Sequence, residues 1–303
     1  MIIAIVCPGR DTTKLEETLV TAGHAIEVWP AIADPTSIEV AVCWRHPHGV
    51  LNSFSGLKLI ASLGAGVDHV LADNSLPPAV PITRFTDPEL GFGISKYVTA
   101  AILNYNYNWA KYLKDQKYER WNPILQETNL KIGVFGMGKL GQTTANGLMG
   151  LGFSVVGYSR SKKHIEGMDC LFGDIEPFLK TIDVLVCLVP LTSETRTLMN
   201  KDFFDKCNLG TYLINVARGE IIDDSALVEA VNSGKLSGAC LDVFSEEPLP
   251  PKHDFWNHPK ITVTPHIASI SSQKSFASQL LQNLDNLNNH TELTNLVDRE
   301  RGY

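Results

Sequence analysis

The sequence predicts an α/β protein with two doubly wound parallel sheets. Short apolar runs alternate with polar stretches of helical length along most of the chain, which favours parallel strands joined by helices. The 303 residues suit two domains, and a hydrophobic content of 44% is sufficient for two cores. In the middle of the chain, an apolar run stops at a glycine-rich turn that a helical pattern follows. We therefore expect two sheet domains with a cleft between them.

Five apolar runs predict the strands of the first sheet. Each run is short, rich in aliphatic residues and bounded by polar or turn-forming residues. The predicted strands are Ile2–Cys7, Ala25–Trp29, Val40–Trp44, Leu57–Leu63 and Ile82–Phe85. Strands separated by helical segments in this way form a parallel, doubly wound sheet.

A glycine turn lies within this first half, at Leu63–Gly66, where a predicted strand ends. It lacks a third glycine, so it is not a dinucleotide-binding fingerprint. Successive amides in such a turn can form an anion-binding concavity that suits a small carboxylate. From these residues alone, an ordinary strand-to-helix turn is an equally good interpretation.

Two helical signals precede the central glycine turn. Thr86–Glu89 combines a capping residue with proline near the first turn, as at the start of a helix. The stretch Tyr97–Tyr112 is apolar around most of its circumference, so we expect a helix that is buried between the domains. A polar segment, Lys114–Asn129, then leads to the next strand.

The central turn has the spacing GxGxxG and follows the apolar run that begins at Leu130. Gly136 would allow the tight turn, Gly138 would let a pyrophosphate approach the backbone, and Gly141 would let helix and strand pack closely. Phosphates would then bind at the helix N-terminus. A chance glycine cluster is the alternative, but the flanking strand and helix favour a Rossmann-like dinucleotide site. Its predicted residues are Gly136, Met137, Gly138, Lys139, Leu140 and Gly141.

The second half predicts a larger sheet and a closing helix. Further strands are expected at Ser154–Tyr158, Val184–Val189, Tyr212–Val216, Ser237–Val243 and Ile261–Thr264. Near the end, leucine and phenylalanine recur at helical spacing and predict an amphipathic helix, with Phe276, Leu280, Leu284 and Leu287 on one face.

Composition excludes several classes of function. A formal net charge of −7 argues against a nucleic-acid or anionic-membrane surface, so an anionic substrate would need a local positive site. The amino terminus lacks the basic region and cleavage site of a secretion signal. The six cysteines are scattered without CxxC spacing, which favours buried free thiols in a cytoplasmic protein. Cys43, His46 and His48 could suggest zinc, but their crowded spacing and lack of a fourth ligand lead us to expect no metal.

Polar residues with catalytic chemistry follow the later predicted strands. Because the carboxyl ends of parallel strands meet at one edge, we expect Arg218, Asp242, Glu247 and His266 to converge there. An arginine can hold a carboxylate through two hydrogen bonds, and a histidine can donate a proton near neutral pH. Glu247 would orient the histidine and favour its protonated form, with Glu246 as the alternative partner. Each of these residues, taken alone, could have an ordinary structural role. The prediction of a catalytic site rests on their expected convergence at one edge of the sheet.

The end of the second strand of the larger sheet indicates which nicotinamide cofactor binds. NAD-binding sites place an acidic residue there, about twenty residues after the glycines, to hold the ribose 2′-hydroxyl. This sequence instead has Ser159, Arg160 and Ser161, followed by lysines. Hydroxyls and a guanidinium suit a 2′-phosphate. A basic solvated loop is the alternative, but we predict NADP(H) as the preferred cofactor, with NAD(H) possible, and reduction as the working direction.

These motifs together resemble the D-isomer-specific 2-hydroxyacid dehydrogenase family, over almost the whole chain. The matching blocks are the turn at 64–68, the GxGxxG, Pro190–Thr192, Asn215–Gly219, Asp242–Phe244, Glu247–Pro250 and Thr264–His266. Trp44 and the ending Val297–Tyr303 resemble the glyoxylate/hydroxypyruvate reductase A group within that family.

The resemblance implies roles for particular residues. Arg218, Glu247 and His266 would be catalytic, and the substrate would be bound by Trp44, Leu63, Ala65, Gly66 and Arg218. Besides the glycine turn and Ser159–Ser161, the cofactor would be bound at later strand ends by Val189, Pro190, Thr195, Val216 and Asp242. The implied organisation is a discontinuous substrate-binding domain, residues 1–96 plus 272–303, and a dinucleotide-binding domain, residues 97–271. A homodimer is also implied.

The activity expected from this resemblance is NADPH-dependent reduction of a small 2-oxo acid, of the glyoxylate or hydroxypyruvate type, with His266 as proton donor. Two alternatives stay open: a dehydrogenase for a bulkier D-2-hydroxy acid, and a nucleotide-sensing protein-binding scaffold like the C-terminal-binding corepressors. Formate dehydrogenases of similar sequence carry glutamine where Glu247 stands, so formate is not the expected substrate.

Overall fold

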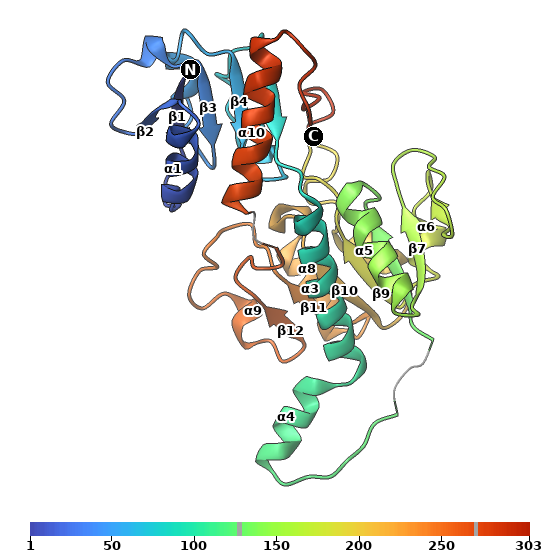
Figure 1. The fold of residues 1–303 in the computed structure, drawn as a ribbon. Helices are drawn as coiled ribbons and strands as arrows, with labels where there is room; N and C mark the ends of the chain where they lie inside the picture. Colours follow the sequence, from blue (N-terminus) through green and yellow to red (C-terminus); the bar gives the residue numbers. More distant parts are fainter. Residues whose placement is uncertain (126–128, 270–271) are drawn as a thin grey trace. The chain divides into compact units, whose positions relative to one another are not determined.

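The computed structural model describes residues 1–125, 129–269 and 272–303 (Figure 1). The chain forms two compact units: unit 1 is Met1–Asp87 with Ser271–Tyr303, and unit 2 is Pro88–Ile270. Unit 2 begins at Pro88, at the start of a helix; the functional division at residues 96/97 stays a prediction. The predicted division at 271/272 and part of the segment Lys114–Asn129 lie outside the described residues.

Unit 1 contains a five-stranded parallel sheet of order β2-β1-β3-β4-β5. The strands are β1 Ile2–Val6, β2 Ala25–Val28, β3 Val40–Cys43, β4 Leu59–Ser62 and β5 Ile82–Arg84. The α-helices are α1 Thr13–Thr21, α2 Asp68–Leu71 and α10 Gln273–Asn288, with 3-10 turns η1 Pro35–Ser37 and η2 Leu51–Ser53. All five predicted strands are confirmed, each ending one residue or so before the predicted limit.

The closing helix α10 belongs to the first sheet although it comes last in the chain. Its apolar face packs with α1 on one side of the sheet, where Phe276, Leu280 and Leu284 are buried. The N-terminal residue Ser272 caps the helix by accepting a hydrogen bond from the amide of Ser275 at 3.3 Å. The predicted amphipathic helix is confirmed.

Unit 2 contains a seven-stranded parallel sheet of order β12-β11-β10-β9-β6-β7-β8. The strands are β6 Lys131–Phe135, β7 Ser154–Tyr158, β8 Cys170–Leu171, β9 Val184–Cys187, β10 Thr211–Asn215, β11 Leu236–Leu241 and β12 Ile261–Val263. The helices are α3 Pro88–Asn106, α4 Trp109–Lys117, α5 Lys139–Gly150, α6 Glu176–Leu179, α7 Lys201–Lys206, α8 Asp224–Asn232 and α9 Asp254–Asn257, with a 3-10 turn η3 Gly219–Ile221. The predicted fold class is confirmed, although the short edge strand β8 was not predicted.

The predicted helix Tyr97–Tyr112 is wrong in two respects. It is the end of α3 and the start of α4, separated by Asn108, which takes a left-handed backbone conformation with φ 52°. Asparagine tolerates this conformation better than most residues, so the chain can change direction there. Val98 and Ile102 are buried as expected, but Trp109 is 58% exposed.

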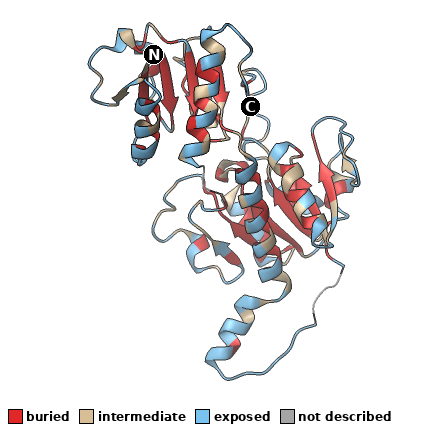
Figure 2. Ribbon diagram, in the orientation of Figure 1, coloured by how far each residue is buried: buried red, intermediate tan, exposed pale blue. Residues whose placement is uncertain are grey.

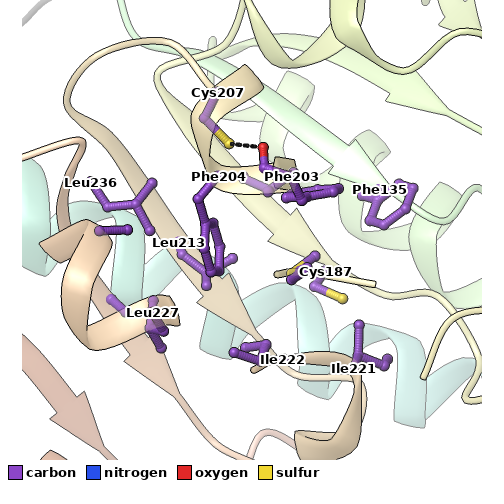
Figure 3. Close-up of a cluster of buried hydrophobic side chains, with 14 of the residues drawn as sticks. Phe135, Cys187, Phe203, Phe204, Cys207, Leu213, Ile221, Ile222, Leu227 and Leu236 are labelled. Atoms are coloured by element: carbon purple, nitrogen blue, oxygen red, sulfur yellow. Dashed lines mark hydrogen bonds between the residues drawn. The ribbon is translucent and has the colours of Figure 1, made fainter. Parts of the chain in front are cut away.

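Both sheets are covered on their two faces, so their central strands are buried, whereas the edge strands β2, β8 and β12 and the outer surfaces of the helices are partly exposed (Figure 2). One face of the larger sheet packs against α7 and α8 through a cluster of aromatic and aliphatic side chains (Figure 3). The labelled members are Phe135, Cys187, Phe203, Phe204, Cys207, Leu213, Ile221, Ile222, Leu227 and Leu236. This packing fixes the central strands β6, β9 and β10, and hence the loops that follow them.

Within the described residues, no helix is both long enough and apolar enough to cross a lipid bilayer.

Candidate active site

The predicted cofactor and catalytic residues of unit 2 all follow the carboxyl ends of parallel strands. β6 lies between β9 and β7, so the chain runs outward from β6 first in one direction and then in the other. The crevice beside such a reversal of strand order is the usual ligand site of an open parallel sheet. The glycine turn follows β6 itself, which places the predicted dinucleotide site at this reversal.

Glycine occupies the three positions of this turn for different local reasons. Gly136 has φ 112°, and a Cβ there would lie 2.6 Å from the carbonyl carbon of Leu188. A Cβ on Gly141 would overlap the carbonyl oxygen of Gly136, so helix α5 could not begin so close to the turn. Gly138 is different: it is exposed, has φ −76°, and a Cβ there would meet nothing within 4 Å.

The surroundings of Gly138 fit a bound pyrophosphate. Gly138 is the N-terminal cap of α5 and supplies no side chain to the first turn, whose amides therefore face the open space beside it. The Met137 side chain points away from that space, because it is buried against Gly157. The Met137 carbonyl accepts hydrogen bonds from the side chains of Lys163 at 2.8 Å and Gln142 at 3.2 Å, which fix the turn.

The loop after β7 carries the residues that are predicted to bind the 2′-phosphate of NADP(H). Ser159 is buried and its hydroxyl donates to the carbonyl of Ser161 at 2.5 Å, so the start of the loop is held in a turn. Arg160 is exposed, and its Nη1 lies 3.1 Å from Oε2 of Glu194. Sequence reasoning did not find Glu194, which lies 34 residues further along the chain.

The loop after β9 is held by threonine hydroxyls. The hydroxyl of Thr195 donates to the carbonyl of Pro190 at 2.7 Å and accepts from the amide of Thr192 at 2.8 Å. Val189 is half-buried against the core, and Val216, after β10, is buried. These two residues therefore present mainly backbone at this edge of the sheet.

His266 and Glu247 form the hydrogen-bonded pair that was predicted. Nδ1 of His266 lies 2.8 Å from Oε2 of Glu247, and the side chains are 33% and 15% exposed. The other oxygen of Glu247 accepts from the amide of Phe244 at 3.1 Å, which fixes the carboxylate. Since Nδ1 is engaged, Nε2 is the ring nitrogen available to a ligand. His266 also has φ 54°, an uncommon conformation for histidine that is typical of functional positions.

The loop of Arg218 lies directly against the loop of Glu247. A Cβ on Gly219 would overlap the backbone of Phe244 and Ser245, so glycine alone permits this contact. Buried Asn215 fixes the other side, because its side-chain amide donates to the carbonyl of Arg218 at 2.9 Å and accepts from Ala217 at 3.0 Å. The structure thus brings Arg218, Glu247 and His266 to neighbouring loops of one unit, as predicted.

Asp242 holds the segment that contains His266. Its buried carboxylate accepts hydrogen bonds from the Thr264 hydroxyl at 2.6 Å and from the amides of Ile267 at 2.9 Å and Ala268 at 2.7 Å. The Tyr97 hydroxyl extends this network from α3, lying 2.5 Å from Oγ1 of Thr264. Burial raises the pKa of Tyr97, so this hydroxyl keeps its proton. In this structure Asp242 acts on the histidine segment; its predicted role in cofactor binding stays a prediction.

The predicted substrate turn in unit 1 is built around Trp44. The indole ring lies on Gly64, where any Cβ would overlap it, and Arg10 lies 4.2 Å from the ring centroid. The amide of Leu63 donates to the carbonyl of Cys43 at 3.0 Å, so it belongs to the sheet. Within the described part of the chain, the amides of Ala65 and Gly66 donate no hydrogen bond, so these two can serve an anion.

His46, one of the two histidines considered above as metal ligands, instead pairs with an aspartate. Nε2 of buried His46 lies 3.2 Å from Oδ2 of Asp73, which also accepts from the amide of Gly49 at 2.9 Å. Among the described residues, no group of three or more His, Cys, Asp or Glu side chains is placed to hold a metal ion. Asp73 was not identified from the sequence, because its partner precedes it by 27 residues.

Comparison with known proteins adds independent findings. Residues 99–268 match the family model described as "D-isomer specific 2-hydroxyacid dehydrogenase, NAD binding domain". The chain is 35% identical over 279 residues to a glyoxylate/hydroxypyruvate reductase A of Yersinia enterocolitica, covering 89% of each protein. A reductase of the same description from Serratia proteamaculans is 36% identical over 279 residues, with the same coverage of 89% of each protein.

Solved structures are similar over the full length. One is a D-isomer specific 2-hydroxyacid dehydrogenase from Xanthobacter autotrophicus Py2 in complex with NADPH and MES, with TM-score 0.94 and 34% identity. Another is an NADPH-dependent glyoxylate/hydroxypyruvate reductase from Sinorhizobium meliloti in complex with NADP and sulfate, with TM-score 0.94 and 32% identity. Each similarity covers 100% of this chain and 99% of the other.

Proposed function

This chain belongs to the D-isomer specific 2-hydroxyacid dehydrogenase family and is an NAD(P)-dependent oxidoreductase; we propose that it reduces a small 2-oxo acid, of the glyoxylate or hydroxypyruvate type, with NADPH. The observation that carries the proposal is the ordered pair His266–Glu247, at 2.8 Å, beside the loop of Arg218. A proton donor, its carboxylate and a guanidinium are the groups that carbonyl reduction of an anionic substrate needs.

Arg218 would hold the substrate. Its guanidinium stays charged and can bind a carboxylate through two hydrogen bonds, which would also bring positive charge close to the adjoining carbonyl oxygen. In unit 1, the amides of Ala65 and Gly66, in a turn bounded by the ring of Trp44, are donors that we propose for a carboxylate. Binding of this kind orients the carbonyl carbon for reaction.

His266 would supply the proton. The carboxylate of Glu247 holds Nδ1 at 2.8 Å, which orients the ring and leaves Nε2 for the substrate. When bound, the reduced nicotinamide supplies the hydride. Nε2 then donates its proton to the oxygen that becomes the hydroxyl, while Asp242 keeps the segment in place.

The cofactor preference rests on the loop after β7. It has no carboxylate within Ser159–Ser161 for a ribose 2′-hydroxyl, and it carries the exposed guanidinium of Arg160. The similar proteins from Xanthobacter and Sinorhizobium were solved with NADPH and NADP. We therefore propose NADPH as the preferred cofactor and NADH as a weaker one.

The test is an assay of NADPH and NADH oxidation with glyoxylate, hydroxypyruvate and a series of bulkier 2-oxo acids. We expect the small acids with NADPH to give the highest kcat/KM. His266→Gln and Arg218→Gln should each lower kcat/KM by about 100-fold or more, because each removes a group that acts in the transition state. The variants should unfold at the wild-type temperature, since both side chains are partly exposed.

Two results would contradict the proposal. Near-normal turnover by either variant would remove the assigned roles, and highest activity with a bulky acid would favour the dehydrogenase for larger D-2-hydroxy acids. If NADPH bound tightly while no 2-oxo acid was reduced, the nucleotide-sensing scaffold would become the better explanation.

A further inference from the structure

We propose that Glu194 moderates cofactor selectivity, because it competes with the 2′-phosphate of NADPH for Arg160. This inference rests on the proposed function and adds a residue that the sequence did not point to. It concerns the ion pair between Nη1 of Arg160 and Oε2 of Glu194, 3.1 Å apart.

The position of the pair comes from the strand order. Arg160 follows β7 and Glu194 lies on the loop after β9, and these two strands flank β6 on opposite sides. Neighbouring strands lie about 4.8 Å apart, so the two loops start about 10 Å apart with the glycine turn between them. The ion pair therefore spans the end of β6, above the turn where we place the dinucleotide.

Both loops are fixed, whereas both charged side chains are exposed. Ser159 and Thr195 hold the backbone on either side through the hydroxyl bonds described above. Arg160 and Glu194 are 56% and 68% exposed. An ion pair this exposed is weak, so a stronger partner for the guanidinium can displace the carboxylate without moving either loop.

The 2′-phosphate of NADPH is such a partner. It carries a charge of about −1.5 to −2 at neutral pH and offers a guanidinium two oxygens at once. To bind it through Nη1, Arg160 has to release Glu194, and the Glu194 carboxylate then lies near the phosphate, which is also an anion. NADH has only a hydroxyl at this position, so the pair can persist. Glu194 thus lowers the affinity for NADPH selectively and moderates the preference that Arg160 creates.

The test measures binding directly, by titration of the whole enzyme with NADPH and with NADH without a 2-oxo acid. Glu194→Gln should lower the Kd for NADPH by about two- to fivefold, the range expected for losing an exposed charge interaction. The Kd for NADH should stay within about twofold. At about 0.5 M salt the NADPH effect should shrink, because exposed charges are then screened.

Two further variants make the test specific. Glu176→Gln removes the same charge from another exposed ion pair, between Glu176 on α6 and Lys180 just after it, and should leave both Kd values unchanged. In an Arg160→Gln background, Glu194→Gln should tighten NADPH binding less than in the wild type, because the competition for Arg160 has been removed and only repulsion between carboxylate and phosphate remains.

Several results would overturn the inference. These are unchanged or weaker NADPH binding in Glu194→Gln, a loss of NADH affinity that would place Glu194 on the ribose hydroxyls, and an equal gain in Glu176→Gln or in the Arg160→Gln background. If the wild-type enzyme failed to bind NADPH at all, the proposed function itself would fail, which is a separate outcome.

Discussion

Replacing Gly138 by alanine should weaken cofactor binding by about 10-fold or more while leaving the fold intact. The residue is exposed, its φ of −76° suits alanine, and the added methyl would meet no protein atom within 4 Å. Loss of glycine at the helix cap costs about 1 kcal/mol, and the less flexible unfolded chain offsets about 0.4–1 kcal/mol of this. The stability of Gly138→Ala should therefore stay within about 1 kcal/mol of wild type.

Cofactor binding should respond very differently, because the methyl would occupy the space that the pyrophosphate needs. Losing one hydrogen bond between an amide and a charged phosphate costs about 1.5–3 kcal/mol, which corresponds to about a 10- to 150-fold weaker Kd for NADPH. Titration with NADPH would measure this loss, and thermal unfolding of the same samples would measure stability.

Two other glycines of the same helix provide the controls. Gly141→Ala should destabilise the protein by about 1–3 kcal/mol or more, because its Cβ overlaps the carbonyl oxygen of Gly136. Gly150→Ala, at the exposed far end of α5, should stabilise the helix by up to about 1 kcal/mol and bind NADPH normally. If Gly138→Ala bound NADPH like wild type, or lost as much stability as Gly141→Ala, the reasoning would be refuted.

Two further predictions concern acid stability and assembly. Buried Asp73 is desolvated, but its hydrogen bonds from Ser75, Gly49 and His46 lower its pKa from 3.8 to about 2, so it should stabilise unit 1 by about 2 kcal/mol above pH 4. The stabilisation from Asp73 is lost as the pH falls from about 4 to about 2. Denaturant unfolding measured from about pH 5 to about pH 2 should therefore show a flatter pH dependence in Asp73→Asn; parallel profiles would contradict this. Large apolar side chains on α4 and the segment after it are exposed, Trp121 at 95% and Leu125 at 97%, so we expect a second copy of the chain to cover them. Light scattering should show a dimer that Trp121→Glu with Leu125→Glu weakens, and a monomeric wild type would contradict this.

The strands were predictable because each depends on a local pattern. Apolar runs such as Ser154–Tyr158 and Val184–Cys187 become buried parallel strands, with errors of a residue or two at their ends. The break at Asn108 was not predictable, because the apolar pattern continues across it and a left-handed residue leaves no pattern in the sequence. Trp109 was accordingly expected to be buried, although it is exposed.

The candidate site was predictable where strand ends carry it. Arg218, Glu247 and His266 each follow a strand, and parallel strands bring their ends to one edge. The interactions between loops depend instead on the order of the strands in the sheet, and local sequence patterns do not predict that order. Glu194 meets Arg160 only because β9 and β7 flank β6, and Asp73 meets His46 only through the packing of unit 1.

The contact between Trp44 and Gly64 has a consequence for how related sequences can diverge. Because the indole ring occupies the place of any side chain at residue 64, the two positions cannot change independently. A larger residue at 64 would require a smaller one at 44, and a smaller residue at 44 would leave room beside the turn that we propose for the substrate's carboxylate. Substitutions at these two positions should therefore occur as pairs across relatives, and the pair should change together with the size of the acid that each relative accepts.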